Sequence, residues 1–337
     1  MKFKLSHITF ETTSVCNLKC RYCYNIWKMP GVDHFEQFNS YKQARKTLKK
    51  LFSIAQVDHV TFTGGEPFLS ERFNELVLFT RLKKKSVAII TNGNIASKND
   101  YLQMLSLGVG LFEVPLHSPD AKAHDFMTNT PHSWEKSLKS LQSLVELGAN
   151  VVAVIVITKA NYLQIKKTLL FIKYQGINRI MLNRFNIGGT GILEKENLWL
   201  SHEELKATYN LAAETGREHQ LLLSSNVCTP ICVLNPAEYQ GISFSHCSAD
   251  VARRPLTLDI LGNLRFCNHS PTILGNIFTD DLETMLNSEK AKLWSQITPD
   301  FCTSCNLYDR CMGGCRAASE QVSNSLNEVD PVVEVLS

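Results

Sequence analysis

Residues 150–160 read "NVVAVIVITKA", an almost unbroken run of β-branched and other apolar side chains. Such a run is typical of a parallel strand that is buried on both faces of its sheet. Helical patterns flank it, "SWEKSLKSLQSLVELG" at 133–148 and "NYLQIKKTLLFIKYQG" at 161–176, and a glycine closes each of them. A strand between two helices predicts right-handed crossovers and a parallel sheet.

The same alternation extends in both directions from this strand. Roughly six strand–helix units cover about 215 residues, fewer than a complete eight-fold barrel needs. We therefore predict an α/β fold: a partial (β/α)6 TIM-like barrel with parallel strands, followed by a small cysteine-rich α+β C-terminal domain. The other strand patterns occupy 7–13, 59–65, 86–93, 110–118 and 177–186, and the other helical patterns occupy 40–55, 71–85, 98–107 and 201–219.

The pattern changes near residue 220, where apolar runs shorten and Pro, Asn and Ser become frequent. We place the barrel at 1–220, the cysteine-rich domain at 221–320 and a loose C-terminal tail at 321–337. The 337 residues, of which 44% are hydrophobic, suffice for a full core.

Charge and hydropathy exclude several classes of protein. A formal net charge of +3 is too small to indicate nucleic-acid binding. The sequence holds no apolar run long enough to cross a membrane, and its start lacks the apolar core of a signal peptide. We therefore expect a cytoplasmic protein without membrane or nucleic-acid partners, in a compartment where disulfides do not persist.

The chain nevertheless has 11 cysteines, and they are clustered. Close spacing in a reducing compartment favours metal binding. Cys16, Cys20 and Cys23 form a C-x3-C-x2-C triplet directly after the first predicted strand, at the edge of a parallel sheet that carries active sites. Three thiolates can hold three irons of a 4Fe–4S cluster and leave the fourth iron open.

This triplet, with Tyr22 before its last cysteine, resembles the signature of the radical S-adenosylmethionine (SAM) superfamily. The resemblance implies that Cys16, Cys20 and Cys23 bind a 4Fe–4S cluster whose open iron is chelated by SAM. One electron then splits SAM to a 5′-deoxyadenosyl radical, which abstracts a substrate hydrogen. A zinc site that lacks one ligand is the alternative.

Segments at the ends of later strands agree with this resemblance. "TGGEP" at 63–67 resembles the family's motif for the SAM amino group, and Glu66 can accept from an ammonium. His117 and Ser118 are either SAM neighbours or loop residues with satisfied hydrogen bonds, and Arg184 is either a ligand of the SAM carboxylate or a surface arginine. The residues expected at the cofactor are Thr63, Gly64, Gly65, Glu66, Pro67, Asn92, His117, Ser118, Asn161 and Arg184.

The remaining cysteines resemble the SPASM extension of radical SAM enzymes. Its pattern, C-x9–15-G-x4-C followed by C-x2-C-x5-C-x3-C, is matched by Cys247, Gly262, Cys267, Cys302, Cys305, Cys311 and Cys315. The resemblance implies one or two auxiliary iron–sulfur clusters. The segment "LDILGNLRFC" predicts a β-hairpin that turns at Gly262–Asn263 and delivers Cys267 to a cluster.

One departure from the SPASM pattern is clear, because no cysteine follows Cys315. The resemblance implies that Cys302, Cys305, Cys311 and the family's last cysteine hold an outer cluster, and that Cys247, Cys267, Cys315 and one upstream cysteine hold an inner one. The outer cluster is then three-thiolate, has a non-cysteine ligand, or is absent. A single twitch-like cluster would use Cys247, Cys267, Cys302 and Cys305, and a zinc ribbon at 302–315 is a further alternative. Cys228 or Cys232 is expected to complete the inner cluster. Alternatively, one of these two cysteines is a free catalytic thiol that gives a hydrogen atom to a substrate radical.

SPASM proteins mostly modify peptides, so the resemblance implies an oxidoreductase that matures a ribosomally made peptide by crosslinking, cyclisation or epimerisation. A radical SAM dehydrogenase or rearrangement enzyme acting on a small molecule is one alternative. A non-catalytic iron–sulfur or zinc scaffold is another. Asn268 after Cys267 counts against a sulfatase-maturing enzyme, where an acidic residue is usual.

The expected partners follow from this reading. Fifteen residues precede Cys16, so we expect no leader-recognition domain there, and the peptide docks directly or through a separate recognition protein. Flavodoxin or ferredoxin would donate electrons. One helix is crowded with basic residues, Lys42, Arg45, Lys46, Lys49 and Lys50. They form either a solvated face or a docking site for an acidic partner.

Overall fold

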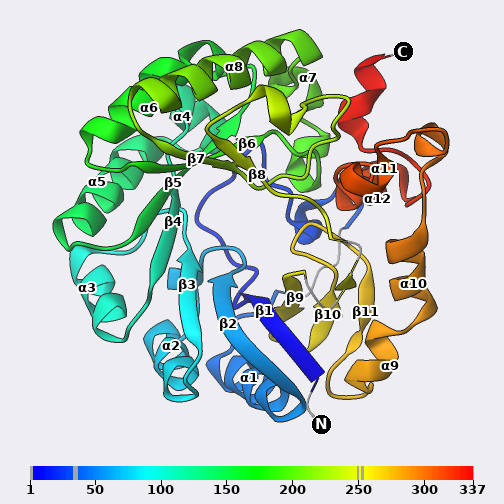
Figure 1. Ribbon diagram of the computed structural model, residues 1–337. Coiled ribbons are helices and arrows are strands. Elements are labelled where there is room, and N and C mark those ends of the chain that lie inside the picture. Colours follow the sequence, from blue (N-terminus) through cyan, green and yellow to red (C-terminus); the bar gives the residue numbers. More distant parts are fainter. Residues whose placement is uncertain (1–2, 33–36, 249, 252–253, 337) are drawn as a thin grey trace.

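The computed structural model describes residues 3–32, 37–248, 250–251 and 254–336. Its strands form one 11-stranded sheet in the order β11-β10-β9-β1-β2-β3-β4-β5-β6-β7-β8 (Figure 1). In chain order they are β1 (Phe3–Glu11), β2 (Ala55–Thr63), β3 (Ser86–Ile90), β4 (Leu111–Pro115), β5 (Val151–Ile157), β6 (Arg179–Arg184), β7 (Leu222–Ser225), β8 (Ile242–Phe244), β9 (Leu256–Asp259), β10 (Asn263–Arg265) and β11 (Ile273–Asn276).

Parallel pairing runs from β9 through β1 to β8, so the carboxyl ends of these strands share one edge of the curved sheet. The central run at 150–160 forms β5, which pairs in parallel with β4 and β6. Its side chains at 151–153, 155 and 157 are buried. The predicted α/β fold with parallel strands is confirmed.

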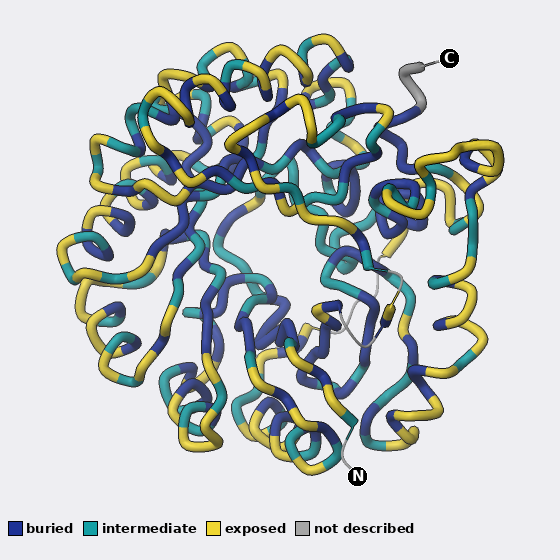
Figure 2. The backbone as a smooth tube through the Cα atoms, in the orientation of Figure 1, coloured by how far each residue is buried: buried dark blue, intermediate teal, exposed yellow. Residues whose placement is uncertain are grey.

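The helices surround this sheet on its outer side, and their solvent-facing turns carry most of the exposed positions (Figures 1 and 2). Ser97 and Ser201 fix two helix starts by capping boxes, in which side chain and backbone satisfy each other's free donors. The helices are α1 (Tyr41–Ile54), α2 (Phe73–Leu82), α3 (Lys98–Ser106), α4 (Ala121–Thr128), α5 (Ser133–Glu146), α6 (Ile165–Tyr174), α7 (Lys195–Leu198), α8 (His202–Glu218), α9 (Leu282–Leu286), α10 (Glu289–Gln296), α11 (Tyr308–Cys311) and α12 (Arg316–Ser323).

The C-terminal region continues the sheet beyond its first strand. β9 pairs in parallel with β1, with Ile8 opposite Leu256. The predicted hairpin is also confirmed, because β9 and β10 pair antiparallel around Gly262. Gly262 has φ +97°, and a Cβ there would lie 2.6 Å from a ring carbon of Phe278, so only glycine fits this turn.

Two strands escaped the sequence patterns. β7 and β8 have four and three residues, too few to show a periodicity. They extend the sheet past β6, which the sequence presented as the last strand. The predicted boundary at residue 220 therefore falls between α8 and β7, inside a continuous sheet.

The prediction of a loose tail at 321–337 is wrong for its described part. Asp330, Val332 and Val333 are buried. Asp330 forms an ion pair with Arg184 at the end of β6, and both side chains are almost wholly inaccessible to solvent. An aspartate inside an apolar segment requires such a cation when it is buried.

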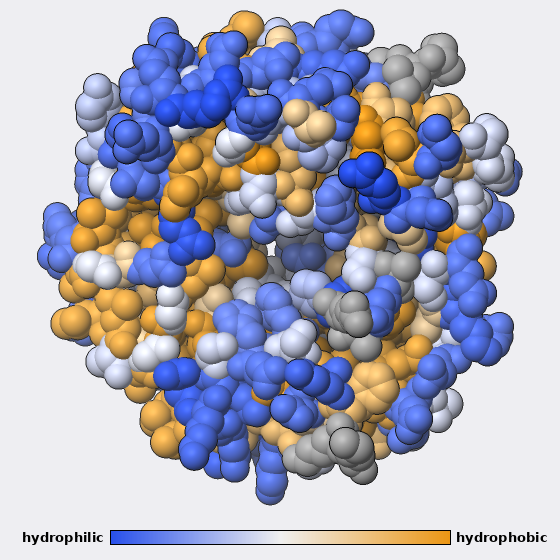
Figure 3. Space-filling model, in the orientation of Figure 1, coloured by the Kyte–Doolittle hydropathy of each residue, from blue (hydrophilic) through white to orange (hydrophobic). Residues whose placement is uncertain are grey.

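Polar side chains cover much of the face drawn in Figure 3, and that face is hollowed near its centre. Among the residues that the structure describes, no helix has both the length and the apolar character needed to cross a bilayer.

Candidate active site and cysteine clusters

The cysteine triplet lies in the loop that follows β1. Cys16, Cys20 and Cys23 are all half-buried. Burial first, and then the charges of Cys23 and Cys16, raise the pKa of the Cys20 thiol to about 12. The three thiols are therefore within electrostatic reach of one another. Bound iron would offset both effects, because it stabilises the thiolate form.

The turn at 63–67 packs directly on this loop. The amide of Gly65 donates to the Thr13 carbonyl at 2.6 Å, and the amide of Glu66 donates to the Val15 carbonyl at 2.8 Å. A Cβ on Gly65 would lie 2.1 Å from the Val15 oxygen. The glycines of this turn thus admit the backbone of the triplet loop.

Glu66 joins this turn to the next one, at the end of β3. Its carboxylate is fully buried and accepts from the Thr91 hydroxyl at 2.7 Å and from the amides of Asn92 at 2.7 Å and Phe68 at 3.1 Å. Burial raises the pKa of Glu66 to about 7, although these donors oppose the shift. A carboxylate has about four acceptor sites, so about one is left for a further donor.

Asn92 brings the end of β3 to the triplet. Its side-chain nitrogen Nδ2 lies 3.7 Å from the Cys16 sulfur and 2.9 Å from Oδ1 of Asn17. The structure thus brings together three predicted features, the triplet, the turn at 63–67 and Asn92, at the carboxyl ends of β1, β2 and β3.

His117 reaches the same loop from the end of β4. Its Nε2 lies 2.7 Å from the Tyr22 hydroxyl, and its Nδ1 accepts from the Val156 amide at 3.2 Å. Burial first, and then His124, hold the pKa of His117 well below its usual range, so the ring is neutral. Because Nδ1 is an acceptor, the proton is on Nε2 and is donated to Tyr22. The Tyr22 hydroxyl in turn hydrogen-bonds Cys20.

Ser118 and Asn161 are occupied by other parts of the fold. The Ser118 hydroxyl donates to Oε1 of Gln164 at 2.9 Å. The Asn161 amide donates to the carbonyls of His117 and Val156, both at 2.8 Å, and accepts from the Thr158 amide. These bonds fix the ends of β4 and β5 relative to each other. For Ser118 they agree with the alternative of a loop residue whose hydrogen bonds are satisfied.

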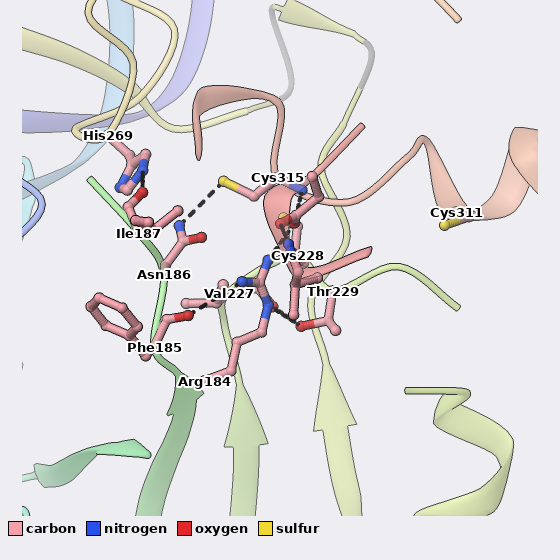
Figure 4. Close-up of polar contacts among 12 residues, drawn as sticks. Arg184, Phe185, Asn186, Ile187, Val227, Cys228, Thr229, His269, Cys311 and Cys315 are labelled. Carbon is pink, nitrogen blue, oxygen red and sulfur yellow. Dashed lines mark hydrogen bonds and ion pairs between the residues drawn. The ribbon is translucent and has the colours of Figure 1, made fainter. Parts of the chain in front are cut away.

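Arg184 faces the C-terminal region (Figure 4). Besides its ion pair with Asp330, its Nε donates to the Thr229 hydroxyl at 3.0 Å and its Nη2 to the Cys228 carbonyl at 2.9 Å. Arg184 is buried, not a surface arginine. A contact between Arg184 and the SAM carboxylate stays a prediction. The partners observed here connect the end of β6 to the C-terminal region.

Cys228, Cys247, Cys267 and Cys315 form one group, which we call the inner thiol set. Cys228 hydrogen-bonds Cys247, and this bond, followed by the charges of Arg254 and Arg316, lowers the pKa of Cys247 to about 6. Nη2 of Arg254 lies 3.5 Å from the Cys247 sulfur. Cys315 is close enough to Cys267 for that thiol to raise its pKa.

The inner thiol set has polar neighbours that suit charged sulfur. Nδ2 of Asn186 donates to the Cys315 sulfur at 3.2 Å, and the Cys315 amide donates to Asp330 at 2.7 Å (Figure 4). The buried Arg254 lies over the Trp294 ring at 4.7 Å. Asp330 and Arg254 were missed by the sequence analysis, since nothing local marks them; buried charge beside the cysteines becomes visible only in the fold.

Cys232, Cys302, Cys305 and Cys311 form a second group, the outer thiol set. Burial first, and then the neighbouring Cys311, Cys232 and Cys305, raise the pKa of Cys302 to about 11. The Ile231 amide donates to the Cys311 sulfur at 3.2 Å. Cys232 and Cys305 are exposed, so this set lies nearer the surface than the inner one.

Among the described residues, no three His, Cys, Asp or Glu side chains converge tightly enough to hold one metal ion. A single zinc ion draws all its thiolates to about 2.3 Å. An iron–sulfur cluster assigns each thiolate its own iron, so its ligands stand further apart. A zinc ribbon and an iron–sulfur cluster therefore require different thiol spacings.

Comparison with known proteins agrees with this geometry. Residues 10–172 match the radical SAM superfamily. The antilisterial bacteriocin subtilosin biosynthesis protein AlbA of Bacillus subtilis is 26% identical over 92% of this chain and 66% of its own length. A PqqA peptide cyclase of Granulibacter bethesdensis is 21% identical over 95% of this chain and 85% of its own.

Among solved structures, Streptococcus suis SuiB bound to its precursor peptide SuiA superimposes with a TM-score of 0.75. It is 19% identical, and the match covers 98% of this chain and 76% of SuiB. SuiB has also been solved with S-adenosylmethionine bound, and radical SAM proteins use a 4Fe–4S cluster together with SAM. Residues 10–172 are thus a radical SAM domain, and a cysteine-rich C-terminal region follows it.

Proposed function

We propose that this chain is a radical SAM enzyme in which Cys16, Cys20 and Cys23 hold the 4Fe–4S cluster that binds SAM. The observation that carries the proposal is the convergence of three strand ends on this loop. Gly65 hydrogen-bonds the Thr13 carbonyl at 2.6 Å, and Asn92 contacts the Cys16 sulfur at 3.7 Å.

When bound, the cluster and SAM supply a one-electron cleavage whose product removes a hydrogen atom from the substrate. The residues around the triplet position its sulfurs to hold the cluster. Tyr22 and Asn92 donate hydrogen bonds toward Cys20 and Cys16, which stabilises their thiolates. Glu66 holds the two neighbouring turns together and retains an acceptor site for an ammonium group.

Cleavage of SAM by the reduced protein tests this assignment. We expect Cys20→Ala to abolish release of 5′-deoxyadenosine, because the cluster then loses a thiolate that no neighbour replaces. Lys19→Ala is the matched control, since Lys19 lies in the same loop but is exposed. Full cleavage by the Cys20→Ala variant would contradict the assignment.

The substrate proposed for this chain is a ribosomally made peptide, which the enzyme crosslinks, cyclises or epimerises. The relatives support this class: one is a peptide cyclase, one serves bacteriocin biosynthesis, and SuiB was solved with its precursor peptide. The two thiol sets add support, because auxiliary clusters can accept the electron that a crosslink releases.

Mass spectrometry of candidate peptides tests the substrate. Short peptides encoded beside the gene are incubated with the reduced protein and SAM in deuterated water. Loss of a hydrogen pair indicates a crosslink, and gain of one deuterium indicates epimerisation. Turnover of SAM that leaves every such peptide unchanged would contradict the peptide class and leave the cleavage chemistry standing.

We also propose that an acidic electron donor such as flavodoxin or ferredoxin docks on α1. Lys42 and Lys49 are exposed on this helix, whereas Lys46 lies over the Phe278 ring at 4.8 Å. The variant Lys42→Glu/Lys49→Glu should slow reduction by flavodoxin at low salt but not by dithionite. Equal flavodoxin rates in variant and wild type would remove this docking site.

A further inference from the structure

We propose that the outer thiol set, Cys232, Cys302, Cys305 and Cys311, is the complete ligand set of a second auxiliary 4Fe–4S cluster. Cys232 supplies the fourth thiolate, because it neighbours Cys311 and Cys305. The inference rests on the iron–sulfur chemistry proposed above, and it is independent of the substrate.

Three of these ligands come from one compact turn. The Cys305 amide donates to the Cys302 carbonyl at 3.0 Å, and the Tyr308 amide donates to the Cys305 carbonyl at 3.2 Å. The Cys311 amide then closes the last turn on Leu307 at 2.9 Å. These local bonds hold the three cysteines on one compact segment, within electrostatic reach of one another.

The fourth ligand arrives from the distant segment after β7. The Ile231 amide donates to the Cys311 sulfur at 3.2 Å, which ties the residue before Cys232 directly to the turn. Pro230 packs on Gly314, where a Cβ would lie only 2.6 Å from the proline Cδ. Two independent contacts thus hold 230–232 against 311–314.

Cys228 and Cys232 are four residues apart and go to different sets. Cys228 hydrogen-bonds Cys247, and its carbonyl is fixed by Arg184 at 2.9 Å. Cys232 instead neighbours Cys311 and Cys305. Figure 4 shows Cys315 beside Asn186, with Cys311 well apart from it. One short segment therefore completes both sets.

This division leaves no cysteine over. The triplet takes three thiols, the inner set four and the outer set four, which accounts for all 11. A twitch-like cluster of Cys247, Cys267, Cys302 and Cys305 would split both sets and leave neighbouring thiols unused. A hydrogen-donating thiol at Cys228 or Cys232 would likewise leave its set with three ligands.

Iron analysis of full-length protein tests the inference. The variant Cys16→Ala/Cys20→Ala/Cys23→Ala serves as background, because it reports only the C-terminal thiols. After anaerobic reconstitution we expect about eight irons per chain, two clusters of about four. Adding Cys232→Ser should remove roughly half of this iron, and adding Cys228→Ser should remove the other half.

Mössbauer and electron paramagnetic resonance spectra make the test specific. The signals kept by the Cys232→Ser and Cys228→Ser variants should differ and together reproduce the background spectrum. Glu238→Gln, an exposed change on the segment after Cys232, should alter neither iron nor spectrum. If Cys232→Ser loses all iron, Cys232→Asp is measured, and iron recovered with this anionic ligand supports the inference.

Four outcomes would overturn the inference. The first two are an unchanged iron content in the Cys232→Ser variant and the loss of the same signal in both serine variants. The others are a Cys232→Asp variant that recovers no iron after Cys232→Ser has lost all of it, and zinc bound in place of iron. None of these readouts involves SAM. Failure of SAM cleavage in the wild-type protein would instead contradict the proposed function and leave the cluster count intact.

Discussion

Nε2 of His117 lies 2.7 Å from the hydroxyl of Tyr22, and this contact joins the end of β4 to the cysteine triplet. The histidine is neutral and receives the Val156 amide on its other nitrogen. The Tyr22 hydroxyl in turn hydrogen-bonds the Cys20 thiol. The aromatic residue of the triplet is thus a hydrogen-bonding bridge between the sheet and the sulfur, in addition to an apolar wall.

Tyr22→Phe tests this bridge. It should lower the free energy of unfolding by about 1–3 kcal/mol, because the buried His117 donor is left unpaired. It should also shift the spectrum of the triplet's cluster, since Cys20 loses a donor. Tyr174→Phe is the control, because Tyr174 is 84% exposed and should show neither effect. An unchanged spectrum in the Tyr22→Phe protein would exclude the bond to Cys20.

Glu66 predicts a pH dependence of stability in the metal-free protein. Its pKa is raised from 4.5 to about 7 by burial, so the folded state favours the protonated form. The stabilisation of the folded state by protonated Glu66 is on the order of 3 kcal/mol. It is fully present below pH 4.5 and is lost as pH rises through about 7. The free energies of unfolding of wild type and Glu66→Gln, measured in urea, should therefore diverge between about pH 5 and pH 8. The wild type should lose more stability than the variant over this range.

The exposed Glu203 provides the matched control. Glu203→Gln should follow the wild-type curve at every pH, because its charge is solvated in both states. If Glu66→Gln also parallels the wild type, the carboxylate titrates as it does in the unfolded chain and its burial has no energetic consequence.

Gly65→Ala should prevent assembly of the triplet site. Its Cβ would stand 2.1 Å from the Val15 oxygen, a backbone atom that cannot rotate away. We expect a soluble protein with little iron in the triplet site and no cleavage of SAM. Gly148→Ala meets no atom within 4 Å and controls for the general effect of such a change, although its positive φ adds modest strain. Normal iron loading of the Gly65→Ala variant would show that the loop can move aside.

The buried pair of Arg184 and Asp330 should be costly to break. Removing one partner leaves an unpaired buried charge, so Asp330→Asn should destabilise the fold by about 3–5 kcal/mol. The exposed pair of Lys98 and Glu146, 2.6 Å apart, should contribute less than about 1 kcal/mol. A double-mutant cycle with Arg184→Met measures the coupling between Arg184 and Asp330, and a coupling near zero would contradict the pair.

The same variants test the predicted role of Arg184 toward SAM. If the guanidinium binds the SAM carboxylate, Arg184→Met should weaken SAM binding even in the Asp330→Asn background. Equal SAM affinity in the single and double variants would restrict Arg184 to its structural contacts.

Arg254 should set the reduction potential of the inner cluster. Its guanidinium is buried and 3.5 Å from the Cys247 sulfur, where a positive charge favours the reduced cluster. Arg254→Gln should lower that potential in a redox titration. Lys206→Gln removes the same charge from an exposed position on α8 and should leave the potential unchanged. A potential equal to wild type in Arg254→Gln would exclude electrostatic tuning at this site.

Local patterns predicted much of this molecule. The run at 150–160, the hairpin at Gly262 and the triplet depend on spacing within about ten residues, and such spacing is visible in a single sequence. β7 and β8 are too short to show a pattern. The sequence therefore predicted the barrel and its carboxyl-end loops, but not how far the sheet continues.

Long-range pairings could not be predicted. Arg184 and Asp330 are 146 positions apart, and a lone aspartate before a proline looks like a solvated tail. Cys228 and Cys232 offered no local sign of which thiol set each would join. Their partners lie in segments whose placement depends on the sheet order, above all on β9 pairing with β1.

That pairing also has a consequence for how the protein is made. β1 ends at Glu11 and its neighbour β9 begins only at Leu256, so β1 leaves the ribosome long before that partner strand. Until then one edge of β1 has no partner, beside a loop of reactive thiols. An exposed edge invites pairing with other nascent chains. Slow translation or cluster shortage in a producing host should therefore favour aggregation before β9 has been synthesised.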